Sequence, residues 1–179
     1  MKKILMVTLI WSAEEKELEF QSWKKESYNK NIYMRWQEKA RVDRPVMVDI
    51  AKDSVKFKKE KHGDDSVLLI YDNLDAHCHE KIRDIFGAAN ILVWYCVPDC
   101  TDLIQPIDAG IGHSIRIYVR HDLDKWLSVD DNLEAWEDRL CAKDRRILMT
   151  NLLAGAMSNI LSDEKKNVRI SSFTRTRCY

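Results

Sequence analysis

Two short apolar runs stand out in the hydrophobic pattern of the chain. Residues 67–71 have the sequence VLLIY and precede Asp72, and residues 90–96 form a second run that Pro98 ends. Unbroken apolar runs of this length are typical of strands buried on both faces. Side chains at the carboxyl ends of such strands line the ligand sites of open α/β sheets. The first run therefore predicts a buried strand that places the Asp72 carboxylate at a functional edge.

A helical pattern begins at a second carboxylate, Asp108, which follows Pro106. The apolar positions downstream recur at helical spacing, at Ile111, Ile115, Tyr118 and Trp126. A strand end and a helix start thus each present an acidic side chain, and 35 residues lie between Asp72 and Asp108.

The remaining pattern predicts strands and helices in both halves of the chain. We expect a strand over residues 4–11 with residues 17–23 as its hairpin partner, although Glu14 and Glu15 are poor turn residues. Residues 24–31 indicate a loop and residues 32–36 another strand.

Helices are expected wherever apolar residues recur every three or four positions. Pro45 suits the first turn of a helix that runs to about residue 61. A helix over residues 76–86 would have Asp75 as its cap and end at Gly87. Residues 132–140 and 145–161 are typical of packing helices.

Length and charge set limits on the organisation of the chain. The 179 residues suit a single domain, with a core over residues 1–126 and C-terminal helices with a basic tail over residues 127–179. The 29 basic and 29 acidic residues balance, so the chain as a whole does not attract nucleic acid electrostatically. Residues 164–179 carry five basic residues and one acidic residue, and residues 121–138 carry seven acidic residues. The basic tail is therefore the better candidate for contacts with phosphate.

Cysteine usage and the N-terminal sequence bear on the compartment. Five cysteines at irregular spacing indicate a reducing environment. The opening sequence MKKILMVTLIWSA is compatible with a secretory signal, but we favour a strand there. No other stretch has the length needed to span a bilayer.

The residues around the two carboxylates carry a resemblance to a known family. Residues 68–77 have the sequence LLIYDNLDAH, and residues 96–111 have the sequence CVPDCTDLIQPIDAGI. Together with LMVTLIWSAEEKEL, WQEKARVDRPVMVDIAK and RISSFTRTRCY elsewhere in the chain, they resemble the pogo, Tigger and jerky branch of the DDE superfamily of transposase endonucleases.

The resemblance implies a metal-dependent site for DNA strand cleavage and transfer. Asp72 matches the second catalytic acid of the family and Asp108 the third, and both would bind Mg²⁺ or Mn²⁺, which prefer carboxylate ligands. Asn73 and His77 match the Asp-Asn-x-x-x-His motif of the family. His77 either orients a phosphate or moves a proton, or it only caps the following helix.

The resemblance also implies an α/β fold, with a ribonuclease H-like mixed sheet flanked by helices. The strand that carries the first acid precedes the segment at which this sequence begins, and Asp43, Asp49 and Asp53 fall in or beside a predicted helix. We therefore expect a sheet that lacks the first central strand and a transposase remnant that is inactive as it stands. Its expected partners are DNA and another transposase chain, in the nucleus or the cytoplasm, and neither a membrane nor a small molecule.

Two other interpretations stay open. The remnant could be a non-catalytic module that binds DNA or protein through its sheet edge and basic tail. Alternatively, Cys96 and Cys100 have a spacing found in zinc sites and could be joined by Cys78, His77 or His79, although no second pair lies at a convincing distance.

Overall fold

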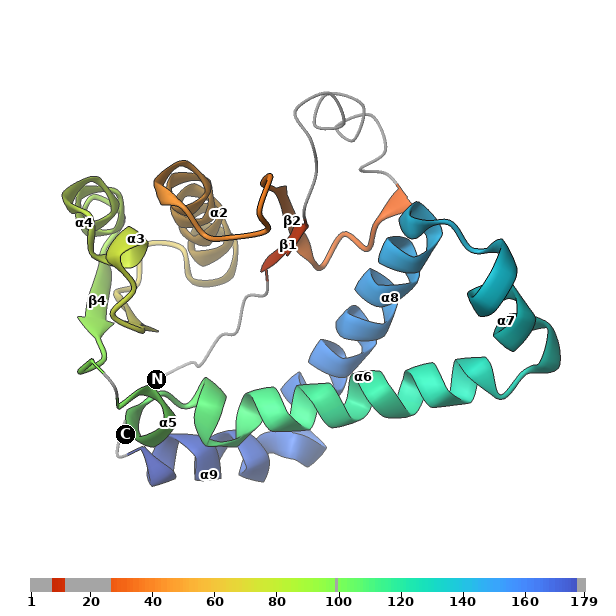
Figure 1. Ribbon diagram of the computed structural model, residues 1–179. Helices are drawn as coiled ribbons and strands as arrows, with labels where there is room; N and C mark the ends of the chain where they lie inside the picture. The colour runs from red at the N-terminus through yellow and green to blue at the C-terminus, as the bar shows by residue number, and fades with distance from the viewer. Residues whose placement is uncertain (1–7, 12–26, 99, 177–179) are drawn as a thin grey trace. The chain divides into compact units, whose positions relative to one another are not determined.

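The structure is a computed structural model that describes residues 8–11, 27–98 and 100–176 (Figure 1). The chain divides into two compact units. The first unit contains residues 1–22 and 33–101, and the second contains residues 23–32 and 102–179. Because one domain can contain two compact units, the expected single domain stays a prediction.

The first unit holds all the described strands. They are β1 (Thr8–Trp11), β2 (Tyr33–Trp36), β3 (Val67–Tyr71) and β4 (Ile91–Tyr95). Its helices are α2 (Arg44–His62), α3 (Asp75–Cys78) and α4 (Glu80–Gly87). The strands expected at residues 32–36, 67–71 and 90–96 are confirmed to within a residue. The proposed hairpin partner at residues 17–23 lies outside the described residues.

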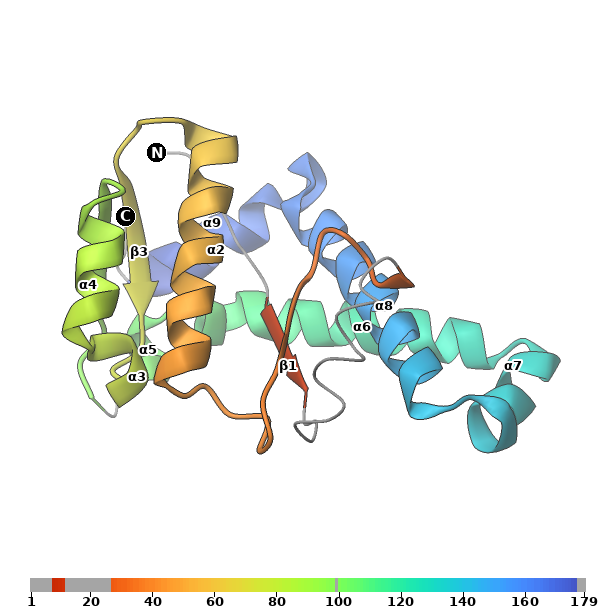
Figure 2. The same ribbon diagram turned by 90° about the horizontal axis from the view of Figure 1, so that it is seen from above.

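The described strands form two parallel pairs, β1 with β2 and β3 with β4. The helices α3 and α4 connect β3 to β4, which is the kind of crossover that parallel strands require. Both views place α2 between the two strand pairs (Figures 1 and 2). Within the described ranges there are therefore two small parallel sheets, in place of the single mixed sheet that the resemblance implied.

Helix α2 begins as the sequence predicts. Pro45 lies in its first turn, and the Asp43 side chain accepts a hydrogen bond of 3.0 Å from the backbone N–H of Val46. This is a typical N-cap, in which a carboxylate satisfies an N–H group that has no partner inside the helix. The cap fixes the point at which the chain turns from β2 into α2.

The core of the first unit lies where α2 and α4 meet the β3–β4 sheet. Met47 of α2 and Phe86 of α4 are fully buried, and Leu69 and Val93 pack against this cluster from one face of the sheet. The other face carries Leu68, Leu92 and Trp94, whose exposed fractions are 42%, 66% and 41%. The prediction of strands buried on both faces is wrong, because alternate residues face opposite sides and these helices cover one side.

The helix expected over residues 76–86 is divided into α3 and α4. His79 adopts an extended conformation between them and caps α4, accepting a hydrogen bond of 3.3 Å from the backbone N–H of Lys81. Asp75 lies inside α3, and its expected role as the cap is wrong because Leu74 occupies that position.

The second unit is helical in its described part. Its elements are the π-helix η2 (Ile107–Ile111), α6 (Gly112–Leu127), α7 (Asp130–Glu134), the π-helix η3 (Ala135–Arg139), α8 (Ala142–Leu161), the 3₁₀-helix η4 (Asp163–Lys165) and α9 (Lys166–Arg175). The short helix α5 (Thr101–Ile104) lies at the division between the units. The helices predicted from Asp108 onward, at residues 132–140 and at residues 145–161 are confirmed.

Helices α6 and α8 pack against each other, and α9 packs against η2 and α8. Ile115, Ala156 and Ile160 are buried in this unit. Among the described residues, no helix combines the length and the apolar character that a membrane crossing would need.

Candidate functional site

Asp72 directly follows β3, at the carboxyl end predicted for it. Its Oδ1 atom lies 2.5 Å from Nδ1 of His77, and the same oxygen accepts a backbone hydrogen bond of 3.4 Å from Leu74. The Asp72 side chain is 41% exposed and the His77 side chain only 14%. The carboxylate is therefore oriented by the protein on one oxygen while it stays accessible from solvent.

His77 is held in place by two tyrosines at the ends of the parallel strands. Its ring stacks on that of Tyr71, with centroids 4.6 Å apart and an interplanar angle of 18°. The Tyr95 hydroxyl donates a hydrogen bond of 2.9 Å to the backbone carbonyl of His77. The interpretation of His77 as a helix cap is wrong, because His79 performs that role and His77 contacts Asp72.

The environment of Tyr71 is apolar enough to change its acidity. Burial raises the pKa of Tyr71 to about 12, with smaller contributions in the same direction from Tyr95 and Asp72 and an opposing hydrogen bond with Ser54. Desolvation disfavours the phenolate, so Tyr71 remains a neutral platform for His77.

Asn73 contributes to the turn between β3 and α3. Its Oδ1 atom accepts a hydrogen bond of 3.1 Å from the Cys78 thiol. Asp72, Asn73 and His77 of the sequence motif thus lie together in one unit. Asn73 links the turn after β3 to the end of α3.

Asp108 lies in η2, in a tight turn that Gln105 begins. The Gln105 carbonyl accepts backbone hydrogen bonds from Asp108 at 3.0 Å and from Ala109 at 3.1 Å. Pro106 is buried, whereas Asp108 is exposed. Asp108 therefore lies at the surface of the second unit, where η2 begins.

The family assignment follows from comparison with known proteins. A family model described as DDE superfamily endonuclease matches residues 3–168. The chain belongs to this family. Comparisons with curated proteins and with solved structures found no match.

Three aspartates that the sequence excluded as the first acid of the family motif have structural roles in this member of the family. Asp43 caps α2, and Asp53 forms an ion pair with Arg35. Asp49 is exposed on α2, 3.9 Å from the Lys52 amine. They lie before or within a helix, as the sequence indicates, and not at the end of a strand.

The Asp72 carboxylate is a suitable ligand for Mg²⁺ or Mn²⁺. It offers a hard carboxylate ligand whose orientation is fixed by His77 and whose side chain reaches solvent. Within residues 8–11, 27–98 and 100–176, no group of three or more His, Cys, Asp or Glu side chains is arranged to hold a metal ion. The same described residues do not gather the ligands of the zinc interpretation. Cys96 is buried, and the Cys78 thiol bonds to Asn73.

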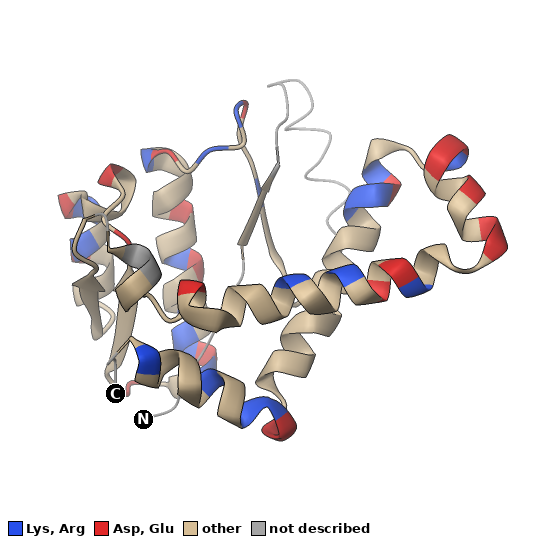
Figure 3. Cartoon of the chain, turned by 60° about the horizontal axis from the view of Figure 1, so that its bottom comes forward, with Lys and Arg blue, Asp and Glu red and all other residues tan. Residues whose placement is uncertain are grey.

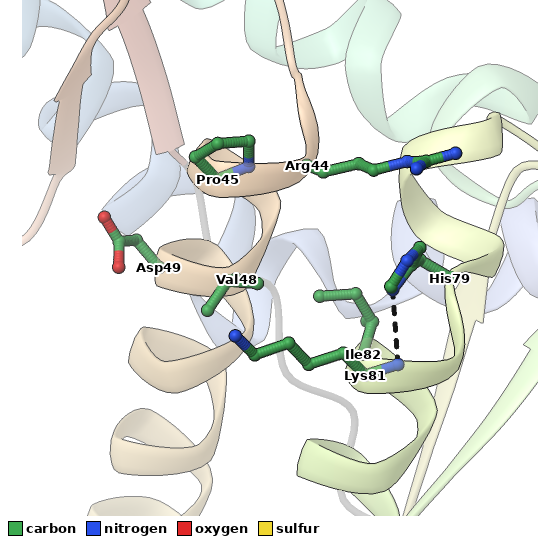
Figure 4. Close-up of a pocket in the computed structure, with 7 residues that line it drawn as sticks. All are labelled: Arg44, Pro45, Val48, Asp49, His79, Lys81 and Ile82. Atoms are coloured by element: carbon green, nitrogen blue, oxygen red, sulfur yellow. Dashed lines mark hydrogen bonds between the residues drawn. The ribbon is translucent and has the colours of Figure 1, made fainter.

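A hollow of about 420 Å³ lies on the first unit between the start of α2 and the start of α4 (Figure 4). The residues that line it are Arg44, Pro45, Val48, Asp49, His79, Lys81 and Ile82. Arg44 also forms an ion pair of 3.2 Å with Asp75. The two cations Arg44 and Lys81 are thus offset by two nearby carboxylates, and the hollow has little net charge with which to select an anion.

The sequence did not reveal Tyr71 and Tyr95 as partners of His77. Both are the last residues of their strands and are paired in the register of the β3–β4 sheet. An aromatic residue at the end of each predicted parallel strand is the signal that could have identified them, because parallel strand ends meet at one edge.

The basic tail is less available for phosphate than its composition suggested. Arg169 donates hydrogen bonds to the carbonyls of Ile160 and Ser162, and Arg175 donates one of 3.4 Å to the carbonyl of Ala109. Lys165 lies 5.8 Å from the centroid of the Tyr118 ring. Several of the positively charged side chains on η4 and α9 therefore contact groups within the second unit.

Proposed function

We propose that this chain is the remnant of a transposase-derived nuclease domain of the pogo, Tigger and jerky type, in which Asp72 and Asp108 still bind Mg²⁺ or Mn²⁺. The match to the family model supports descent from a DDE superfamily endonuclease. The single observation that carries the site is the contact between Asp72 and His77 at the carboxyl end of β3, because it orients a metal-binding carboxylate before any ligand arrives. The substrate in this proposal is DNA, the sheet descends from a ribonuclease H-like one, and the site of action is the nucleus.

The roles of the residues follow from their contacts. Asp72 offers its accessible carboxylate to the metal ion, and Asp108 contributes a second one from the surface of η2. His77 fixes the orientation of Asp72, and Tyr71 and Tyr95 fix His77. When bound, the divalent ions supply charge stabilisation for the attacking and leaving oxygens of a phosphate.

Calorimetric titration with Mn²⁺ tests this proposal. The wild-type chain should bind, and the double variant Asp72→Asn, Asp108→Asn should lose most of that binding while keeping its helical content. A matched control is Asp75→Asn, Asp130→Asn, which removes the same charge from two other exposed positions. Equal titration curves for the wild type and the Asp72 and Asp108 variant would refute the assignment.

A non-catalytic DNA-binding module is the second candidate. It is favoured by the observation that no three potential ligands gather within the described part of the chain. DNA affinity that persists in a chelator and in Asp72→Asn would support this module. Nicking of supercoiled DNA by the wild type in Mn²⁺, and not by Asp72→Asn, would contradict it and support the nuclease.

A further inference from the structure

Helix α6 presents one histidine and two arginines to solvent on a single face. His113, Arg116 and Arg120 are spaced by three and four residues, so they lie on the same side of the helix, and all three are exposed. Ile115 lies on the opposite side and is buried, and α8 packs against α6. We call His113, Arg116 and Arg120 the α6 stripe.

No acidic side chain interrupts the α6 stripe along its own helix. Residues 109–121 contain no Asp or Glu. The first carboxylate on the same side is Asp124, one turn further on, 3.9 Å from Nε of Arg120. In Figure 3 the acidic residues gather on α7 and η3, beyond the end of α6. The positive charge therefore belongs to the first half of the helix, next to η2 and Asp108.

Arg116 has no internal role that would explain its charge. Within the described part of the chain its side chain forms neither a hydrogen bond nor an ion pair. Arg169 and Arg175 of α9 differ, because each donates to a backbone carbonyl. An exposed arginine at the centre of a cationic stripe is free to bind an external anion.

We propose that the α6 stripe binds the phosphate backbone of double-stranded DNA beside Asp108. This rests on the proposed function, since it takes DNA as the ligand and deepens the site of which Asp108 is part. Arg116 and Arg120 lie about 6 Å apart along the helix axis, at about 1.5 Å per residue. Phosphates of one DNA strand follow each other every 3.4 Å or so along the duplex axis, so this separation is about two phosphate steps and the two guanidinium groups can each reach a different phosphate of one strand.

Ile117 supports an extended nucleic acid as the ligand. It is four residues after His113 and three before Arg120, so it lies along the edge of the α6 stripe, and it is 52% exposed. A small inorganic anion would gain nothing from this apolar side chain, whereas the sugar surface between two phosphates can cover it. The α6 stripe therefore holds the backbone in register with Asp108 without reading the bases.

The test measures DNA affinity against salt concentration, with the full chain in a chelator. The variant Arg116→Gln, Arg120→Gln is compared with Lys39→Gln, Arg41→Gln, which removes the same charge from exposed positions of the first unit. Anisotropy of a labelled duplex is followed between about 50 and 200 mM salt, the range over which phosphate contacts strongly change affinity.

The α6 stripe variant should lose about 10-fold in affinity at low salt. Each lost phosphate contact should reduce the slope of log K against log salt by about 0.9, so the slope should fall by about 1.8. The conservative variant Arg116→Lys, Arg120→Lys keeps the charge and should restore most of the slope. Equal slopes in the stripe variant and the Lys39 and Arg41 control would overturn the proposal.

The same variants separate this inference from the proposed function. Mn²⁺ binding in the α6 stripe variant should match that of the wild type, because no metal ligand is changed. Unchanged DNA slopes with intact Mn²⁺ binding would reject the stripe and keep the metal site. A wild-type chain without salt-dependent DNA binding would reject the stripe as well as DNA as the ligand.

Discussion

Gly110 of η2 faces Ser172 of α9 so closely that a side chain at residue 110 would require Ser172 to move. A Cβ atom on Gly110 would be 2.9 Å from Oγ of Ser172, which is buried. Gly110 also has a φ angle of 154°, which residues with a side chain rarely adopt. The absence of a side chain at Gly110 therefore leaves the space that the Ser172 hydroxyl occupies.

Gly110→Ala should destabilise the protein by about 2 kcal/mol, because it combines backbone strain with a steric clash. Urea unfolding measures the change, and Gly87→Ala is the control, since an added Cβ there meets nothing within 4 Å. Ser172→Gly combined with Gly110→Ala should recover only part of the loss, because the strain at φ remains. If the unfolding free-energy changes of the two single variants simply add up in the double variant, the proposed clash between the two residues is wrong.

Arg169→Ala should lower the free energy of unfolding by about 1–3 kcal/mol and leave DNA affinity unchanged. Arg169 donates to the Ile160 and Ser162 carbonyls at the end of α8, and its loss leaves these acceptors without their charged donor. Lys166→Ala, at an exposed position on the same helix, is the control for charge. A stable Arg169→Ala with weaker DNA binding would instead make this side chain part of a phosphate surface.

Tyr71 should make the first unit sensitive to alkaline pH. Burial raises its pKa from the ordinary 10.0 to about 12, so folding favours the protonated phenol. This stabilisation is complete below pH 10 and is lost as pH rises through 12. The two-unit shift corresponds to roughly 3 kcal/mol at 1.36 kcal/mol per unit.

Tyr71→Phe should therefore reduce the loss of stability between pH 10 and 12, as measured by chemical unfolding at several pH values. Some loss should remain, because burial also raises the pKa of Tyr33. An identical alkaline loss in Tyr71→Phe and the wild type would show that this phenol does not couple to folding.

Asp43→Ala should cost about 1 kcal/mol of stability through the loss of the α2 cap. Asp43 accepts from the backbone N–H of Val46 and from Nε2 of Gln37, so it also ties the preceding turn to the helix. Asp43→Asn keeps an acceptor oxygen and should retain most of the stability. Thermal unfolding of the two variants shows whether the hydrogen bond or the negative charge of Asp43 matters. An equal loss of stability in both variants would mean that the charge, and not the cap, stabilises the helix.

Most helices and strands, and the family to which the chain belongs, could be predicted from local patterns of residues. Helical and strand periodicities are local properties, so residues 67–71, the Pro45 helix and the helix after Asp108 could be predicted from spacing alone. Asp72, Asn73 and His77 could be identified as one motif because the family resemblance depends on short runs of adjacent residues.

The contacts of those residues could not be predicted in this way, because they depend on how the chain packs. The uncovered face of the β3–β4 sheet, the break at His79 and the internal bonds of Arg169 depend on segments that pack together from distant parts of the chain. The stacking of His77 on Tyr71 and the contact of Gly110 with Ser172 have the same origin. Composition gives the charge of a residue, but packing decides whether that charge bonds to a neighbouring carbonyl, as in Arg169, or stays exposed to solvent, as in Arg116.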